Sequence, residues 1–192
     1  MIKNNVLKNI NQIIENKNLI LVGNKSVPLS LIKQSLEEEI QTLHVYELSG
    51  RKMKSKEDFY NEFYTKIPLI NHPGKNLDAV RDCLLTLELY NKQKHLIFWK
   101  DADVLLKNNT KFFYEVVDLI LGTLKELTVG DEIEKENSPE EFKDWIPTWV
   151  GCLITGDLTL LQNEYDYSIL KSLFWEEMFF ELDSNTTVFL TK

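Results

Sequence analysis

Five short strand-like runs, separated by polar turns and by longer stretches with helical spacing, constrain the fold of this chain most strongly. They lie at residues 19–22, 44–48, 96–99, 149–154 and 187–190. Apolar runs of about four to eight residues bounded by turn residues are typical of buried strands. Strands that alternate with helices favour a parallel sheet, because each parallel connection needs a crossover. The sequence therefore predicts an α/β fold with a mostly parallel sheet.

The stretches between these runs carry apolar residues at three- and four-residue spacing, which predicts amphipathic helices. They span residues 6–14, 29–40, 56–64, 77–90, 110–127 and 167–182. Two helix starts have a capping signal, because Ser55 precedes Asp58 by three residues and Asn76 directly precedes an apolar-periodic stretch. Residues 131–144 are acidic and short of apolar anchors, so a loop is expected there.

The length of the chain indicates how many domains it forms, and its charge indicates which class of partner it binds. With 192 residues, we expect residues 1–192 to form a single domain with a sizeable core. Tyr64, Trp99 and Trp149 are assigned to that core. The formal net charge is −8, from 30 acidic and 22 basic residues. Because nucleic acids bind clustered Lys and Arg, this balance argues against a nucleic-acid partner and favours a basic protein.

The patterns of cysteine, histidine and hydropathy exclude several other classes. Cys83 and Cys152 both lie in apolar surroundings, which favours buried free thiols in a reducing compartment over a disulfide. Two cysteines and three scattered histidines lack metal-ligand spacing, and we expect no metal and no cofactor. No signal peptide is visible, and no apolar run approaches the roughly 18 residues of a membrane span. A cytoplasmic protein with no membrane partner is therefore expected.

Residues 73–84 predict a loop that leads into an amphipathic helix capped by Asn76. Its apolar residues recur with helical spacing and predict one buried face: Leu77, Val80, Leu84 and Leu87. Asp78 and Asp82 lie one turn apart, where like charges destabilise an isolated helix by roughly 0.2–0.5 kcal/mol. The helix dipole favours Asp78 in the first turn but has faded at Asp82. Stability alone does not explain this pair, whereas a partner with a basic surface would explain it.

This helix and its surroundings resemble the barstar family, which are small inhibitors of bacterial ribonucleases. The most specific matches are residues 74–79 and 82–84, which follow the family's pattern at the family's spacing. Residues 46–50 and 55–59 follow it as well, and residues 95–99 fall where the family has its central strand. The resemblance covers a little over half of the chain.

The resemblance implies a barstar-like three-layer fold with a core at residues 44–155. Residues 1–43 and 160–192 have no counterpart in small family members, so they would add extra strands and helices at both termini. It also implies a binding mode in which an acidic helix and its preceding loop block the active site of a ribonuclease. Carboxylates then take the place of substrate phosphates, in charge-assisted hydrogen bonds to basic residues.

By the same resemblance, the contact face runs from the loop at residues 71–75 into the helix at residues 76–90. Asp82 matches the family's principal carboxylate, and Asp78 matches a supporting one. The expected partner-binding residues are Asp78, Asp82, Arg81, Asn76, Lys75 and His72.

The sequence departs from the family at its aromatic positions. The family has an aromatic residue just before the principal aspartate, where this chain has Arg81. The family also has one or two aromatic residues before the loop glycine, where this chain has His72 and Pro73. A further aromatic residue of the family, near the end of the same helix, is Leu87 in this chain. Aromatic side chains commonly carry interface energy, so either the partner differs or the contact face is rebuilt. The three-residue spacing of Arg81 and Asp78 also predicts an ion pair between them.

A second function class has a weaker motif. Residues 19–26 resemble the strand and Lys-Ser end of a P-loop, Asp101 resembles a Walker B acid, and residues 153–156 resemble a sensor strand. A P-loop needs glycines whose N–H groups cradle phosphates, but Leu19 and Asn24 stand at those positions. The sequence therefore predicts no catalysis.

Two hypotheses follow. The favoured one is a non-enzymatic inhibitor of barstar type, an immunity-like protein that blocks a basic ribonuclease or other toxin through its acidic helix. The alternative is a catalytically inactive relative of the clamp-loader ATPases that acts as an assembly subunit.

Overall fold

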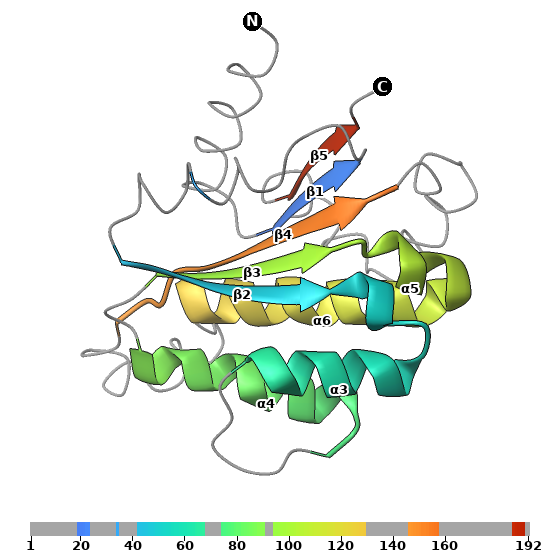
Figure 1. The fold of residues 1–192 in the computed structure, drawn as a ribbon. Coiled ribbons are helices and arrows are strands. Elements are labelled where there is room, and N and C mark those ends of the chain that lie inside the picture. Colours follow the sequence, from blue (N-terminus) through green and yellow to red (C-terminus); the bar gives the residue numbers. More distant parts are fainter. Residues whose placement is uncertain are drawn as a thin grey trace, which may run out of the picture.

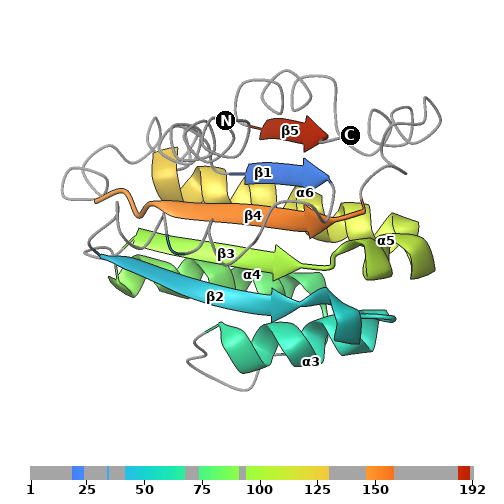
Figure 2. The same ribbon diagram turned by 45° about the horizontal axis from the view of Figure 1, so that its top comes forward.

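A five-stranded parallel sheet forms the centre of the described structure. The computed structural model describes residues 19–23, 34, 42–67, 74–90, 94–129, 146–157 and 186–190. Within these ranges the strands are β1 (Leu19–Gly23), β2 (Leu43–Ser49), β3 (Lys94–Lys100), β4 (Val150–Gly156) and β5 (Thr186–Leu190). They lie in the order β2-β3-β4-β1-β5, and all neighbours pair in parallel (Figures 1 and 2). The predicted α/β fold with a parallel sheet is confirmed.

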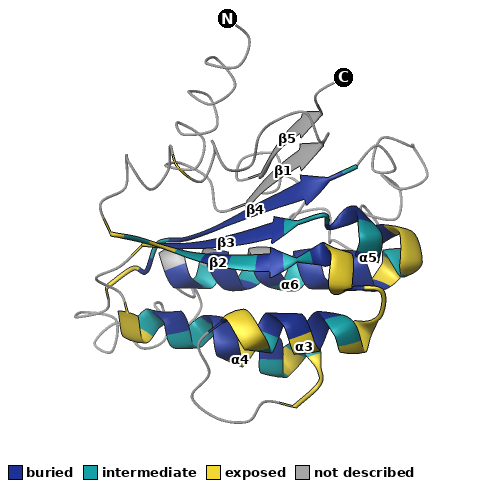
Figure 3. Cartoon of the chain, viewed as in Figure 1, coloured by how far each residue is buried: buried dark blue, intermediate teal, exposed yellow. Residues whose placement is uncertain are grey.

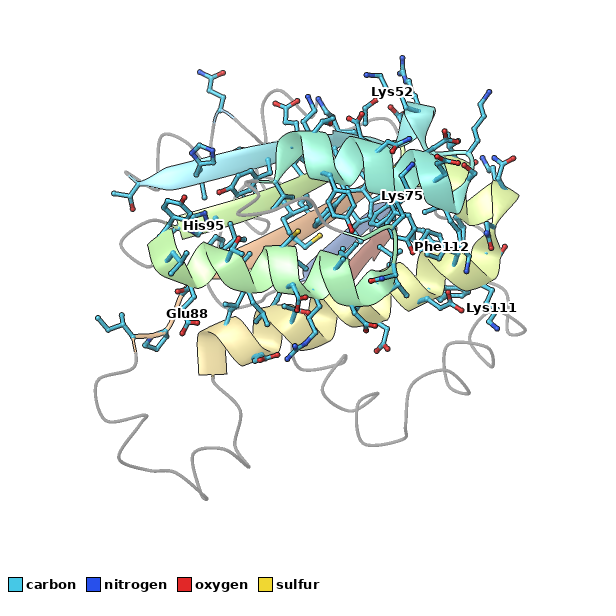
Figure 4. All side chains as sticks on the ribbon, turned by 90° about the horizontal axis from the view of Figure 1, so that it is seen from below. Lys52, Lys75, Glu88, His95, Lys111 and Phe112 are labelled. Carbon is cyan, nitrogen blue, oxygen red and sulfur yellow. The ribbon has the colours of Figure 1, made fainter. Side chains whose placement is uncertain are left out.

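Helices cover one face of this sheet. The described helices are α3 (Lys56–Lys66), α4 (Leu77–Leu85), α5 (Asp103–Asn108) and α6 (Thr110–Val129), with 3-10 turns η1 (Gly50–Lys52) and η2 (Thr86–Tyr90). Figures 1 and 2 show α3, α4 and α6 on the same side of the strands. Seen from the helical side, α4 lies between α3 and α6 (Figure 4). No helix in the described part of the chain is long and apolar enough to cross a membrane.

The central strand β3 is buried on both faces (Figure 3). Ile97 and Trp99 belong to the core beneath the helices. Leu96 and Phe98, which alternate with them and point to the other face, are only 1% and 2% exposed. A strand covered on both sides needs apolar residues at every position, which explains the continuous run in the sequence.

Aromatic rings fix the helices to the sheet. The ring centroids of Phe59 on α3 and Trp99 on β3 are 5.7 Å apart. Phe59 also meets the edge of Phe112 on α6 at 5.6 Å, and Trp99 lies 5.5 Å from Phe113. Such pairs contribute about 0.5–1.5 kcal/mol beyond the area that they bury. This cluster therefore sets where α3 and α6 lie, and α4 fits between them.

The sequence pattern does not predict α5. Asp101 follows β3 with a φ of 50°, so the chain turns sharply, and Ala102 N donates to the Thr155 carbonyl at 2.9 Å. Lys100 and Asp101 resemble the polar end of a strand, and a six-residue helix is too short to display a helical period. The close approach of β3 and β4, rather than local periodicity, places this helix.

Some of the other predicted elements are confirmed, and the rest lie outside the described residues. The predicted start of α3 is confirmed, because Ser55 Oγ accepts from Asp58 N at 3.2 Å. The predicted helices at residues 6–14 and 167–182 and the acidic loop at residues 131–144 lie outside the described residues. Of the predicted helix at residues 29–40, Gln34 alone is described.

Candidate partner-binding face on α4

The N-terminus of α4 is fixed by Asn76. Its side-chain oxygen accepts a hydrogen bond from Ala79 N at 2.8 Å, and its backbone is extended with φ −148°. The cap satisfies one of the N–H groups that a helix start leaves without an intrahelical partner. The predicted capping role of Asn76 is thus confirmed. After Leu85 the chain tightens into η2, so the helical path reaches Tyr90 as expected.

The inward face of α4 belongs to the core. Its buried members are Val80, Cys83 and Leu84, Leu87 in η2 continues the same face, and Leu77 packs partly buried against the core. Cys83 and Cys152 are both buried and free, as predicted. Burial, followed by the nearby Asp82 charge, raises the pKa of the Cys83 thiol. The buried face orients the helix so that Asp78, Arg81 and Asp82 are exposed.

Arg81 pairs with α6 rather than with its own helix. Its Nη2 donates to both carboxylate oxygens of Glu126, at 2.8 and 2.7 Å. The predicted pair between Arg81 and Asp78 is therefore wrong. Since α4 and α6 lie side by side, a carboxylate 45 positions along the chain competes successfully with one a single turn away.

The loop before α4 is tied to α3. Lys75 Nζ lies 2.5 Å from Glu57 Oε1, and the Tyr64 hydroxyl donates to the Gly74 carbonyl at 2.7 Å. Figure 4 shows Lys75 where the chain enters α4 beside α3. His72, the remaining predicted contact residue, lies outside the described residues.

Asp78 and Asp82 remain as exposed carboxylates. Neither makes a hydrogen bond or an ion pair through its side chain with any described residue, and both are exposed. The two basic residues of the same stretch, Lys75 and Arg81, are each paired with an acid from a neighbouring helix. The outward surface of α4 therefore presents negative charge that its own cations do not offset.

Tyr64 is a residue of this face that sequence reasoning assigned to the core. It is half-buried and stacks on Tyr60, with ring centroids 6.2 Å apart and planes 14° from parallel. Burial first, and then Cys83, Tyr60 and Asp82, raise the pKa of Tyr64 to about 12. Its hydroxyl therefore stays protonated and donates to Gly74 at neutral pH. The four-residue spacing of Tyr60 and Tyr64 was the one sequence signal for this stacked pair.

The described residues of the P-loop-like interpretation lie in β1 and β4 and directly after the carboxyl end of β3. Asp101 accepts a hydrogen bond from Arg51 Nε at 2.9 Å. Residues 24–26, which would form the phosphate loop, lie outside the described residues. The described residues contain no group of three or more His, Cys, Asp or Glu side chains placed to hold a metal ion.

The fold and this face define an α/β protein whose parallel sheet supports an acidic, exposed helix. The chain belongs to the barstar family: the family model, described as barstar (barnase inhibitor), matches residues 43–141, from β2 to beyond α6. Proteins of this family are non-catalytic and bind barnase-type ribonucleases. By its family, the chain is a barnase-inhibitor-like protein.

Two further comparisons concern the whole chain. No curated protein matches it. The solved structure of the Aeropyrum pernix ORC2 protein, in ADPNP–ADP complexes, is similar, with a TM-score of 0.53 and 12% sequence identity. The similarity covers 97% of this chain but 45% of that chain, so this chain spans less than half of the ORC2 length. At this identity the likeness shows a shared fold alone.

Proposed function

We propose that this protein is a non-enzymatic inhibitor that binds a basic ribonuclease, or a related toxin, through the acidic face of α4. One observation carries the proposal: Asp78 and Asp82 are exposed and unpaired among the described residues, while Lys75 and Arg81 are neutralised by Glu57 and Glu126. A stretch with two acids and two bases thereby acts as an acidic surface. Family membership supports the same face, since the matching motif contains these aspartates.

The chemistry of such a face suits a ribonuclease active site. An enzyme that cleaves RNA binds phosphates with Arg and Lys side chains, and a carboxylate makes charge-assisted hydrogen bonds to the same groups. Asp82 is the principal contact and Asp78 the supporting one. Opposite charges also speed the encounter of the two proteins, which helps an immunity protein to neutralise its toxin before RNA is cut.

The test is inhibition and binding of a purified barnase-type ribonuclease. Asp82→Ala is expected to weaken binding by about 2–5 kcal/mol, because it leaves a basic group of the enzyme buried and unpaired. Asp78→Ala is expected to weaken binding less. Asp157→Ala, which removes the same charge just after β4, is the matched control and should bind like the parent chain. Unchanged affinity of the Asp82 variant would remove Asp82 from the interface.

The second candidate is an inactive relative of the clamp-loader ATPases. The observation behind it is the fold that 97% of this chain shares with the ORC2 protein, whose solved structure is of ADPNP–ADP complexes. Titration with a fluorescent ATP analogue separates the two candidates. Saturable binding that Lys25→Ala abolishes would favour the ATPase relative, whereas inhibition of a ribonuclease without nucleotide binding would favour the inhibitor.

A further inference from the structure

We infer that Glu126 on α6 is a positioning residue for the acidic face of α4, because it holds Arg81 away from the two aspartates. The Glu126 carboxylate accepts from Arg81 Nη2 through both oxygens, at 2.8 and 2.7 Å. The two side chains are 45% and 31% exposed, so the pair lies at the surface rather than in the core. Its role therefore concerns the surface of α4 more than the stability of the fold.

The position of Arg81 explains why such a partner is needed. Arg81 follows Asp78 by three residues and directly precedes Asp82. On a helix, opposite charges three or four residues apart pair with each other. A released Arg81 would pair with Asp78 and offset the charge that the proposed partner recognises. Glu126 supplies a competing carboxylate from outside the motif.

A second pair repeats the arrangement on the other side of α4. Lys75 precedes Asp78 by three residues, and Glu57 of α3 lies 2.5 Å from its ammonium group. Each basic residue beside the aspartates is thus paired with an acid from a flanking helix. Glu126 is the better test of the two, because its pair with Arg81 does not also anchor the loop at Gly74.

The matched experiment compares Glu126→Gln with Glu115→Gln. Glu115 also lies on α6, where it pairs with Lys56 at 3.6 Å and with Lys111 at 3.8 Å. Both substitutions raise the formal net charge of −8 by one, but only Glu126→Gln releases a cation that α4 carries. The double variant Arg81→Gln/Glu126→Gln restores the original net charge and removes the cation.

The inference rests on the proposed contact function of α4, so two probes are used: a barnase-type ribonuclease, and an octalysine peptide followed through the backbone amide shifts of α4. Glu126→Gln should weaken binding of both about two- to five-fold, and the loss should shrink in high salt. Glu115→Gln should bind like the parent chain, and the double variant, which has no cation at position 81, should bind both probes more tightly than Glu126→Gln does.

Three results would overturn the inference: equal losses for the Glu126 and Glu115 variants, no recovery in the double variant, or an octalysine peptide that leaves the α4 amides unshifted. If the parent chain fails to bind the ribonuclease while the octalysine series follows the expected order, the proposed function fails and the role of Glu126 stands. Circular dichroism confirms that each variant is folded.

Discussion

The hydroxyl of Tyr46 lies 3.0 Å from Nδ1 of His95, and this contact joins β2 to β3. The other ring nitrogen of His95 lies 3.2 Å from the Tyr90 carbonyl oxygen. A carbonyl only accepts, so Nε2 carries a proton, and in the neutral imidazole Nδ1 then accepts from the Tyr46 hydroxyl. Burial lowers the pKa of His95, the bond to Tyr90 opposes this effect, and the nearby His44 lowers the pKa further.

We predict that the protein loses stability as the pH falls below about 6.5, the ordinary pKa of histidine. Below this pH the unfolded chain binds a proton at His95, whereas the folded chain, with its lower pKa, does not. The contribution of neutral His95 to the free energy of unfolding is therefore complete above this pH and is lost as the pH falls below it. One such proton changes the free energy of unfolding by at most about 1.4 kcal/mol per pH unit. Urea unfolding between pH 7.5 and 5.5 measures the slope, which His95→Gln should flatten. His44→Gln should reduce the slope less, because it removes only the smallest of the causes that act on the pKa of His95.

Removal of the cap on α4 should destabilise the protein by about 0.5–2 kcal/mol. Asn76→Ala deletes the oxygen that accepts from Ala79 N at 2.8 Å and leaves that N–H to water. Chemical unfolding gives the loss, and hydrogen exchange should show it concentrated in the first turn of α4. Ser55→Ala, which deletes the corresponding acceptor on α3, should leave α4 protected. Uniform loss of protection across both helices would contradict a local cap.

Gly50 should not accept a methyl group. A Cβ there would lie 2.5 Å from the Lys100 carbonyl oxygen and closer still to that of Asp101, and both are backbone atoms that cannot rotate away. Gly50→Ala should therefore destabilise the protein by roughly 1–3 kcal/mol. Gly122→Ala is the contrast, because its Cβ meets nothing within 4 Å and alanine favours a helix by up to about 1 kcal/mol. Equal midpoints of thermal unfolding for the two variants would contradict the predicted clash at Gly50.

Structural features that depend on residues close together in the sequence could be predicted. The cap of Asn76 and the buried face of Val80 and Leu84 depend on spacing within two helical turns, which the sequence displays directly. The continuous burial of β3 follows in the same way from its run of apolar residues. The parallel pairing followed from the alternation of strands and helices.

Features set by tertiary neighbours could not be predicted. Arg81 has an acid three residues away, yet it pairs with Glu126, because packing of α4 against α6 brings a second carboxylate within 2.7 Å. Periodicity also gave no sign that Tyr64 would reach Gly74. The sheet order β2-β3-β4-β1-β5 likewise depends on which apolar faces meet, and no local pattern encodes it.

Tyr64 provides the clearest case in which one hydroxyl couples the sheet-bound helices to the candidate contact loop. Its ring is held by the stack on Tyr60, and its hydroxyl donates to the Gly74 carbonyl at 2.7 Å. The bond fixes the loop just before Asn76, where α4 begins. Since Gly74 is exposed, water can replace the donor when it is lost, so the cost to folding is small.

We therefore predict that Tyr64→Phe lowers the free energy of unfolding by no more than about 1 kcal/mol but weakens ribonuclease binding by a larger factor. The phenyl ring keeps the stack on Tyr60, whereas the freed loop must be ordered again when the partner binds. Urea unfolding and a binding titration measure the two effects. Tyr60→Phe is the control, because the Tyr60 hydroxyl makes no hydrogen bond with any described residue. Equal affinities of the two variants would show that the bond to Gly74 does not prepare the loop for binding.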